Sequence, residues 1–226
     1  RDAFFAAMRA CELAGICSCF PHPADQYELI TSKTWMATLA SDCEVCLPLA
    51  TLVSKEAVST NALEAARDAL RALADVRSHR GDSAALSTAN KDCIQKGVVK
   101  CGWSWEAQFV FDFCGEERLA CRMTEMLEAE GCSTSVCIVQ EWVDFDFEMR
   151  LFFFVPRDWD SSVKLLPRRF EYNTWGEWDD EDGKPGYFSH VTRLLCLDRW
   201  QQDDKALRHA EEKAIDVSQY LIRWLC

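Results

Sequence analysis

A lysine at the end of a β-branched run is the first side chain in this sequence whose position suits phosphate chemistry. Lys100 ends the strand-like sequence VVK. It is followed by Gly102 and Ser104, which are typical of a tight turn. An ammonium group beside backbone amides at a strand end can bind a polyphosphate. The alternative interpretation is an exposed lysine at a strand end, because lysine side chains are rarely buried.

The run VCIVQEWVDFDFEMRLFFF contains the residue types that a purine nucleotide requires. A buried strand ends there in polar residues, and a second strand returns after a short connection. A purine needs an acceptor for its exocyclic amine, backbone groups for its ring edge, an apolar wall and a carboxylate for the ribose hydroxyls. These types are supplied at close range by Gln140, Glu141, Trp142, Val143 and Glu148. The alternative is an ordinary hairpin with polar residues at its turn.

Three arginines on the strands that follow are candidates for binding an anionic substrate. They are Arg150, Arg168 and Arg169. A guanidinium group can neutralise a carboxylate or the acyl-phosphate formed from it, and we take Arg150 and Arg169 as candidate catalytic residues. Because Arg150 alternates with apolar neighbours, the competing interpretation is that it faces solvent.

The 13 cysteines are scattered through apolar segments of a long chain, so we interpret them as reduced and mostly buried residues of an intracellular protein. A zinc-stabilised interaction module is the alternative, since thiolates at short spacing suit tetrahedral coordination. Two groups could provide the ligands: Cys11, Cys17, Cys19 and His22, or the pair Cys43 and Cys46. No second CxxC or HxxxH sequence follows at zinc-finger spacing. The sequence also contains no local motif typical of a nucleophilic pair of Cys and His.

Charge and hydropathy exclude two classes of protein. The formal net charge of −12 argues against sequence-independent binding of nucleic acid, which requires clustered Lys and Arg. No apolar run is long enough to span a bilayer. We therefore expect a cytoplasmic protein with no nucleic-acid or membrane partner. At 226 residues the chain is long enough for one domain of two lobes.

The order of apolar patterns predicts an α+β fold with consecutive strands. Helices are expected up to Gly15, around Trp35, over Asn61–Arg77, over 116–130 and over 203–226. Strands are expected from near Val45, in a run that carries Pro48, in a hairpin over 97–113, and in the three runs VCIVQEWV, FEMRLFFFV and VKLLPRRFEY. The acidic run WDDEDGKPG is typical of a solvated hairpin tip.

Three segments of the sequence resemble the ATP-grasp superfamily, in particular its carboxylate–amine ligases. SKTWMATLASDCEVCLPLATLV is similar to the segment that opens the family's nucleotide-binding domain, and Lys33 holds the place of its lysine. VVKCGWSWEAQFVF resembles the second lysine and phosphate loop, and QEWVDFDFEMR resembles the adenine hinge of the purine-biosynthetic carboxylases. The three segments occur in the family's order over residues 32–172.

The resemblance implies two lobes with antiparallel sheets flanked by helices and a nucleotide cleft between them. An N-terminal helix and linker over 1–31 would precede the ATP-grasp-like domain over 32–226. That domain would comprise an opening helix, strand and amphipathic helix over 32–95, a phosphate-loop lobe over 96–142 and a C-terminal lobe over 143–226. The C-terminal lobe would be incomplete, because the family's metal-binding strands would follow the last helix.

For the triphosphate, the resemblance implies that Lys33 and Lys100 contact phosphates and that Lys100 also lies near the adenine. The family's phosphate loop usually contains several glycines, whereas this one has Gly102 beside Trp103 and Trp105. Mg²⁺ would accompany ATP, with its carboxylate ligands beyond the end of this chain.

For the nucleoside, the resemblance implies that Gln140 or Glu141 faces the adenine amine. Trp142 and Val143 would offer backbone bonds to the ring edge, and Glu148 would hold the ribose.

The reaction class implied by the resemblance is ATP-dependent ligation through an acyl-phosphate. The acceptor would be an unknown small molecule or protein, and the oligomeric state stays open. The alternative function is a nucleotide-binding assembly chaperone or pseudoenzyme. It rests on KCGWS, which is similar to the ATP-grasp branch that assembles a translation initiation factor.

Overall fold

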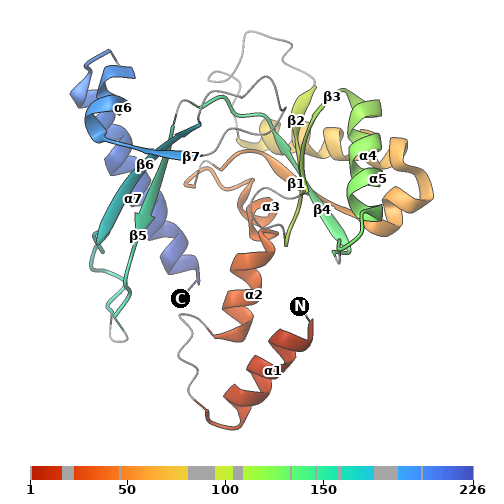
Figure 1. Ribbon diagram of the computed structural model, residues 1–226, viewed down its shortest axis with the longest axis horizontal. Helices are drawn as coiled ribbons and strands as arrows, with labels where there is room; N and C mark the ends of the chain where they lie inside the picture. Colours follow the sequence, from red (N-terminus) through yellow and green to blue (C-terminus); the bar gives the residue numbers. More distant parts are fainter. Residues whose placement is uncertain are drawn as a thin grey trace. The chain divides into compact units, whose positions relative to one another are not determined.

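The computed structural model describes residues 2–16, 23–45, 47–80, 95–103, 109–132, 134–145, 147–156, 159–175, 188–199 and 201–225. The chain forms two compact units, Arg1–Val143 and Asp144–Cys226, each with its own antiparallel sheet (Figure 1). This architecture confirms the predicted α+β class.

The first unit is built on a four-stranded sheet with the order β1-β4-β2-β3. Its strands are β1 (Ala50–Ser54), β2 (Lys96–Cys101), β3 (Val110–Cys114) and β4 (Val136–Glu141). The expected hairpin is confirmed, because β2 and β3 pair antiparallel with Val99 opposite Phe111. β4 lies between β1 and β2, which places the proposed adenine hinge at the end of a central strand.

Two helices cover one face of this sheet, as Figure 1 shows: α4 (Lys55–Arg80) and α5 (Glu116–Glu128). The apolar residues that they bury include Leu73, Leu119, Met123, Val99 and Val139. Burying such side chains contributes about 1.5–3 kcal/mol each, so this layer holds the unit together.

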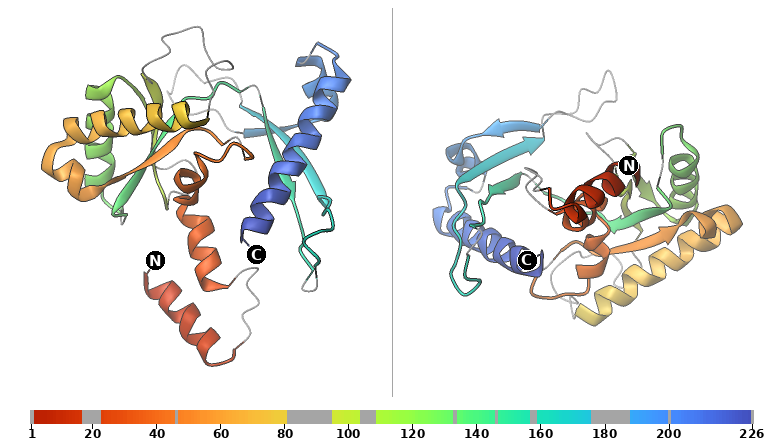
Figure 2. Two further views of the ribbon diagram at one scale, coloured as in Figure 1. Left: turned by 180° about the vertical axis from the view of Figure 1, so that it is seen from behind. Right: turned by 90° about the horizontal axis from the view of Figure 1, so that it is seen from below.

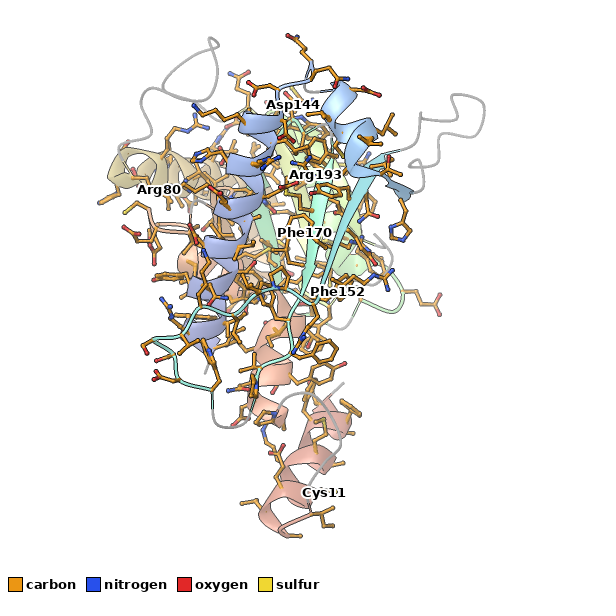
Figure 3. The ribbon with its side chains drawn as sticks, turned by 90° about the vertical axis from the view of Figure 1, so that its left-hand side faces the viewer. Cys11, Arg80, Asp144, Phe152, Phe170 and Arg193 are labelled. Carbon is orange, nitrogen blue, oxygen red and sulfur yellow. The ribbon has the colours of Figure 1, made fainter. Side chains whose placement is uncertain are left out.

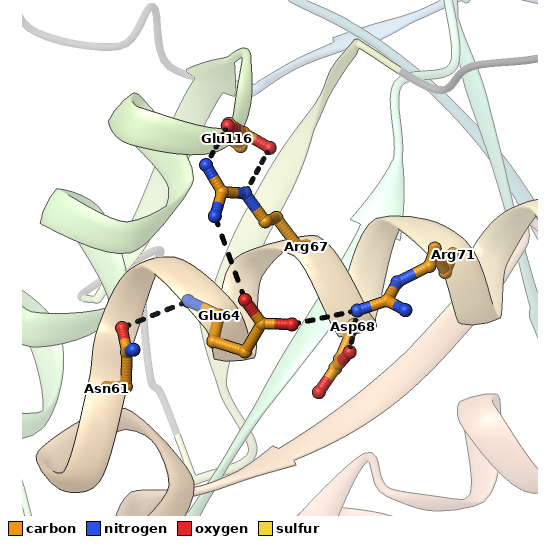
Figure 4. A network of polar contacts seen from close by, with 6 residues as sticks. All are labelled: Asn61, Glu64, Arg67, Asp68, Arg71 and Glu116. Carbon is orange, nitrogen blue, oxygen red and sulfur yellow. Dashed lines mark hydrogen bonds and ion pairs between the residues drawn. The ribbon is translucent and has the colours of Figure 1, made fainter.

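α4 contains the predicted helix over Asn61–Arg77 and has a kink at its start. Asn61 has φ −159° and ψ 94°, and its Oδ1 accepts a hydrogen bond of 3.2 Å from the Glu64 amide. The residue therefore acts as an internal N-cap. Arg67 then joins α4 to α5 through bonds of 3.0 and 2.8 Å to the Glu116 carboxylate (Figure 4).

The other face of the sheet packs on a small apolar cluster that includes Ala40, Ala50 and Ile138. It is bordered by the short helix α3 (Trp35–Leu39), which contacts β1. The strand expected from Val45 starts at Ala50 instead, so that prediction was wrong. Pro48 has no amide hydrogen for a sheet ladder. Leu49 donates its amide to the Glu141 side-chain carboxylate at 2.8 Å, and the register of β1 with β4 starts at Ala50.

The N-terminal segment forms α1 (Asp2–Leu13) and α2 (Ala24–Ser32), and the second of these was not predicted. α1 ends before Gly15, as expected, and Gly15 has φ +71°. The buried ring of Phe5 joins α1 to α2 through Tyr27 at 5.8 Å between centroids and to the end of the β2 segment through Trp103 at 5.3 Å.

The second unit contains a three-stranded sheet of order β5-β6-β7: β5 (Glu148–Phe152), β6 (Arg169–Trp175) and β7 (Phe188–Val191). α6 (Arg193–Arg199) and α7 (Asp204–Leu225) complete it (Figure 2). Its core includes Tyr172, Cys196 and Leu207. Phe152 on β5 and Phe170 on β6 are labelled in Figure 3. The run WDDEDGKPG lies outside the described residues.

Two expectations for this unit were incomplete. The strand expected over VKLLPRRFEY starts only at Arg169, after Pro167, and β7 was not predicted. The segment before β6 is instead held to α7 by the buried Gln219, which bonds the Leu165 amide at 2.9 Å and its carbonyl at 3.0 Å. The predicted last helix is confirmed as α7.

The prediction that the cysteines are mostly buried was wrong for the residues that the structure describes. Cys101, Cys137 and Cys196 are buried and Cys132 is partly exposed, whereas four others are exposed: Cys11, Cys43, Cys114 and Cys121. The exposed thiols lie on helix surfaces, at a strand end and in a turn, where the apolar pattern of the sequence does not reveal the buried side. Every cysteine in the described ranges is a free thiol.

Candidate functional site

The first unit brings Lys100, Gln140, Met36 and Lys33 together from separate elements. The Lys100 ammonium donates a hydrogen bond to Gln140 Oε1 and lies 3.4 Å from Met36 Sδ. Lys33 is close enough for its charge to act on Lys100. We call these four residues the lysine cluster. In the sequence, Lys100 and Gln140 lie more than sixty positions after Lys33 and Met36.

Sheet register explains why Lys100 and Gln140 share a face. β2 and β4 are adjacent and antiparallel, with Val98 opposite Gln140 and Lys100 opposite Ile138. Successive side chains of a strand point to opposite faces, so Lys100, Gln140 and Ile138 lie on one face. This face is the one opposite α4 and α5, since Val99 and Val139 pack under those helices.

The surroundings of the two lysines disfavour their charged forms. Burial, followed by the charge of Lys33, lowers the pKa of Lys100 to about 8. Burial also lowers the pKa of Lys33. A bound polyanion would stabilise both ammonium groups in their charged form.

Backbone packing places Lys33 beside the end of β2. Lys33 has φ 58° and forms the left-handed C-cap of α2. A Cβ on Gly102 would lie 2.3 Å from the Ser32 carbonyl oxygen, so only glycine allows α2 and the end of β2 to approach this closely. In the structure, Gly102 allows α2 to pack closely against the end of β2. Ser104 and Trp105 lie outside the described residues, and Trp103 packs on Phe5.

Glu141 points away from the lysine cluster. Its Oε1 accepts the Leu49 amide at 2.8 Å and its Oε2 accepts from Arg77 at 3.1 Å, while the residue is 9% exposed. The sequence left Gln140 and Glu141 as alternatives for the adenine amine, and only Gln140 lies beside Lys100. Glu141 instead joins β4 to α4 and to the start of β1.

The two residues after β4 continue along its edge. The Trp142 amide donates to the Lys96 carbonyl at 3.2 Å, so this N–H group already has a protein partner. The Lys96 ammonium lies 3.7 Å from the centroid of the Trp142 ring. Val143 is exposed and ends the first unit.

Glu148, Arg150 and Arg169 belong to the second unit. Glu148 Oε1 accepts from the Arg150 guanidinium and, at 3.1 Å, from the buried Asn173 amide. Arg169 pairs with Glu171. With Arg150 opposite Glu171 and Glu148 opposite Asn173, these residues line one face of the β5-β6 pair. The side chains of Arg150 and Arg169 are 49% and 69% exposed.

Sequence reasoning missed a second polar network in this unit. Arg193, labelled in Figure 3, bonds Glu211 at 2.6 Å and Asp204 at 2.7 Å, and the Tyr172 hydroxyl donates to Glu211. Burial, followed by Glu211, raises the pKa of Tyr172. Nothing in the sequence indicates these contacts, because the partners come from a strand and two helices.

Within the described ranges, no group of three or more His, Cys, Asp or Glu residues is placed to hold a metal ion. Cys17, Cys19, His22 and Cys46 of the alternative zinc sites lie outside those ranges. No helix in the described part of the chain is long and apolar enough to cross a membrane.

Comparisons of the chain with family models, with curated proteins and with solved structures each returned no match.

Proposed function

We propose that this chain binds ATP in the manner of an ATP-grasp protein, with the triphosphate at Lys33 and Lys100 and the adenine beside Gln140. The observation that carries the proposal is that Lys100 contacts Gln140 near the end of β4, with Lys33 close enough for its charge to act on Lys100. Two ammonium groups whose pKa values are both lowered suit a ligand with several negative charges.

The adenine position follows from complementarity with the Lys100 and Gln140 pair. An ammonium donor beside an amide oxygen matches the N7 acceptor and N6 donor on one edge of adenine. Met36 supplies an apolar surface at the same place. For Glu148, Arg150 and Arg169, which lie on one face of the β5-β6 pair, the resemblance implies contacts with the ribose and with an anionic acceptor.

The reaction that we propose is ATP-dependent ligation through an acyl-phosphate. A carboxylate oxygen of the acceptor attacks the γ-phosphorus, ADP leaves, and a nucleophile then displaces phosphate from the acyl carbon. In this scheme Lys33 and Lys100 offset negative charge on the phosphates, and the protein contributes mainly through placement and charge neutralisation. Mg²⁺ would supply further charge neutralisation when bound.

Calorimetric titration of the chain with ATP and GTP, with and without Mg²⁺, tests the proposal. Lys100→Met and Lys33→Met should each weaken ATP binding by at least about tenfold, the effect of losing one charge-assisted contact of ~1.4 kcal/mol or more. Lys55→Met is the matched control, because it removes the same charge from the far end of the unit, where Lys55 bonds the Leu127 carbonyl at 3.0 Å.

Two outcomes would contradict the proposal. Folded wild-type chain that binds no nucleotide would exclude the site in this chain. Equal weakening by all three substitutions would indicate a non-specific effect of net charge. If ATP binds as expected, turnover with candidate carboxylates separates a ligase from the assembly chaperone or pseudoenzyme, which would bind ATP without acceptor-dependent hydrolysis.

A further inference from the structure

Two thiols lie side by side at the end of β2. Cys101 is the last residue of that strand, and Cys132 follows Gly131 in the turn between α5 and β4. Their Sγ atoms are 4.0 Å apart, although 31 positions separate the residues in sequence. The turn returns to this place because β4 pairs with β2, with Cys137 opposite Cys101.

The distance between the two sulfurs can close with little rearrangement. A disulfide needs an S–S separation of about 2.05 Å, so the sulfurs must approach by roughly 2 Å. Gly131 is exposed, has φ +85°, and has open space around the position of a Cβ. This turn can therefore shift toward the strand at small cost in packing.

We propose that Cys101 and Cys132 form a reversible disulfide that ties the end of β2 to the α5–β4 turn. The proposal is independent of nucleotide binding. It assigns a modification site to a residue directly after Lys100 and directly before Gly102. In a reducing compartment such a bond would be transient and would respond to oxidation.

The oxidant is a small-molecule disulfide, and Cys132 reacts with it first. Cys132 is partly exposed, whereas Cys101 is 3% exposed and has a pKa raised chiefly by burial. The Cys132 thiolate attacks one sulfur of the oxidant, which forms a mixed disulfide and releases one thiol. Cys101 then loses its proton and attacks Cys132 Sγ, which breaks the mixed disulfide and releases the second thiol. The protein loses two hydrogens and the oxidant becomes two thiols.

Cys137 lies opposite Cys101 on the neighbouring strand, and its surroundings oppose reaction. It is fully buried, its thiol donates to the Val53 carbonyl at 3.6 Å, and burial raises its pKa to about 12. A thiol with such a pKa is almost wholly protonated at neutral pH and is a poor nucleophile. Cys137→Ala is thus a suitable control.

The test treats the full chain with oxidised glutathione, blocks remaining thiols and maps peptides by mass spectrometry without reduction. We expect a linked peptide pair joining Cys101 to Cys132 in the wild type and in Cys137→Ala, and none in Cys132→Ser. Dithiothreitol should abolish the link. Recovery of both residues as blocked thiols, or a link from Cys101 to Cys137 instead, would overturn the proposal.

Thermal unfolding provides a second measurement that does not depend on peptide recovery. Closing a loop of this length should raise the unfolding midpoint of the oxidised wild type by roughly 10 °C, since the cross-link restricts the unfolded chain. Cys132→Ser should show no such increase on oxidation. A midpoint that rises equally in both proteins would contradict the assigned pair.

Discussion

The Lys100 ammonium on β2 donates a hydrogen bond to Gln140 Oε1 on β4, across two neighbouring strands and on the sheet face opposite α4 and α5. The bond places a partly buried cation next to an amide that is itself neutral. Gln140 therefore orients Lys100 without neutralising it. Lys33 adds a second positive charge nearby, which further disfavours the charged form of Lys100.

Lys100→Met should raise the free energy of unfolding by about 1 kcal/mol at pH 7, while it weakens ATP binding. Burial penalises the ammonium in the folded state, and methionine fills similar space without a charge. Because the side chain is only partly buried, solvent screening keeps the gain below what the full pKa shift would give. Urea denaturation of both proteins measures the difference.

The stability difference between the wild type and Lys100→Met should depend on pH. The folded pKa of Lys100 is about 8 and its ordinary value is 10.5, so the unfolded state binds more protons between these limits. Wild-type stability should therefore increase from pH 8 to pH 10.5 relative to Lys100→Met, and the advantage of the substitution should shrink. A stability difference that stays constant over this window would contradict a buried, charged Lys100.

ATP affinity should decrease as pH rises above 8. A bound polyanion favours charged Lys100, so above the pKa of the free site each binding event must take up a proton. We expect ATP to bind at pH 9.5 at least about tenfold more weakly than at pH 7.5, following the linkage of one proton. Calorimetry in two buffers of different ionisation enthalpy measures the proton uptake directly. Lys100→Met is the control, and a flat wild-type profile would contradict this prediction.

Glu141→Ala should destabilise the first unit by about 3 kcal/mol. The substitution leaves the Leu49 amide and the Arg77 guanidinium without their carboxylate partner in a largely buried site. Asp216→Ala in the second unit should cost less than about 1 kcal/mol, because its ion pair with Lys164 is more than half exposed. Denaturant unfolding of the two variants compares these values, and equal losses would show that Glu141 is not a buried structural anchor.

Gly102→Ala should destabilise the chain more than Gly15→Ala. A Cβ at Gly102 would lie 2.3 Å from the Ser32 carbonyl oxygen, and backbone must move to relieve that contact. Gly15 has φ +71° but open space around it, so alanine there costs only about 1 kcal/mol of backbone strain. Thermal unfolding ranks the two variants. The reverse order would mean that α2 and the end of β2 separate easily.

Periodic patterns made much of the secondary structure predictable. The helical spacing of Leu63, Ala66, Leu70 and Leu73 indicated α4, and the repeat from Leu207 to Leu221 indicated α7. Proline residues explain the errors in the starts of two strands. Pro48 and Pro167 each delayed a predicted strand, because proline lacks the amide that a sheet ladder needs.

The candidate site was only partly accessible to the same reasoning. Lys100 and Gln140 were chosen for their chemical types, but their contact depends on the register of β2 against β4. Gln140 and Glu141 could not be separated from composition, since both are polar residues at a strand end. Strand alternation then placed one beside Lys100 and the other under α4 with Arg77.

The sequence by itself determined the α+β class and the residue types available for a phosphate and a purine, because these depend on local periodicity and side-chain chemistry. Tertiary structure alone decided which of those residues meet. Lys33 reaches Lys100 because Gly102 admits the end of α2, and Cys132 reaches Cys101 because β4 pairs with β2. Contacts of this kind depend on packing between segments distant in the chain, so no local sequence pattern predicts them.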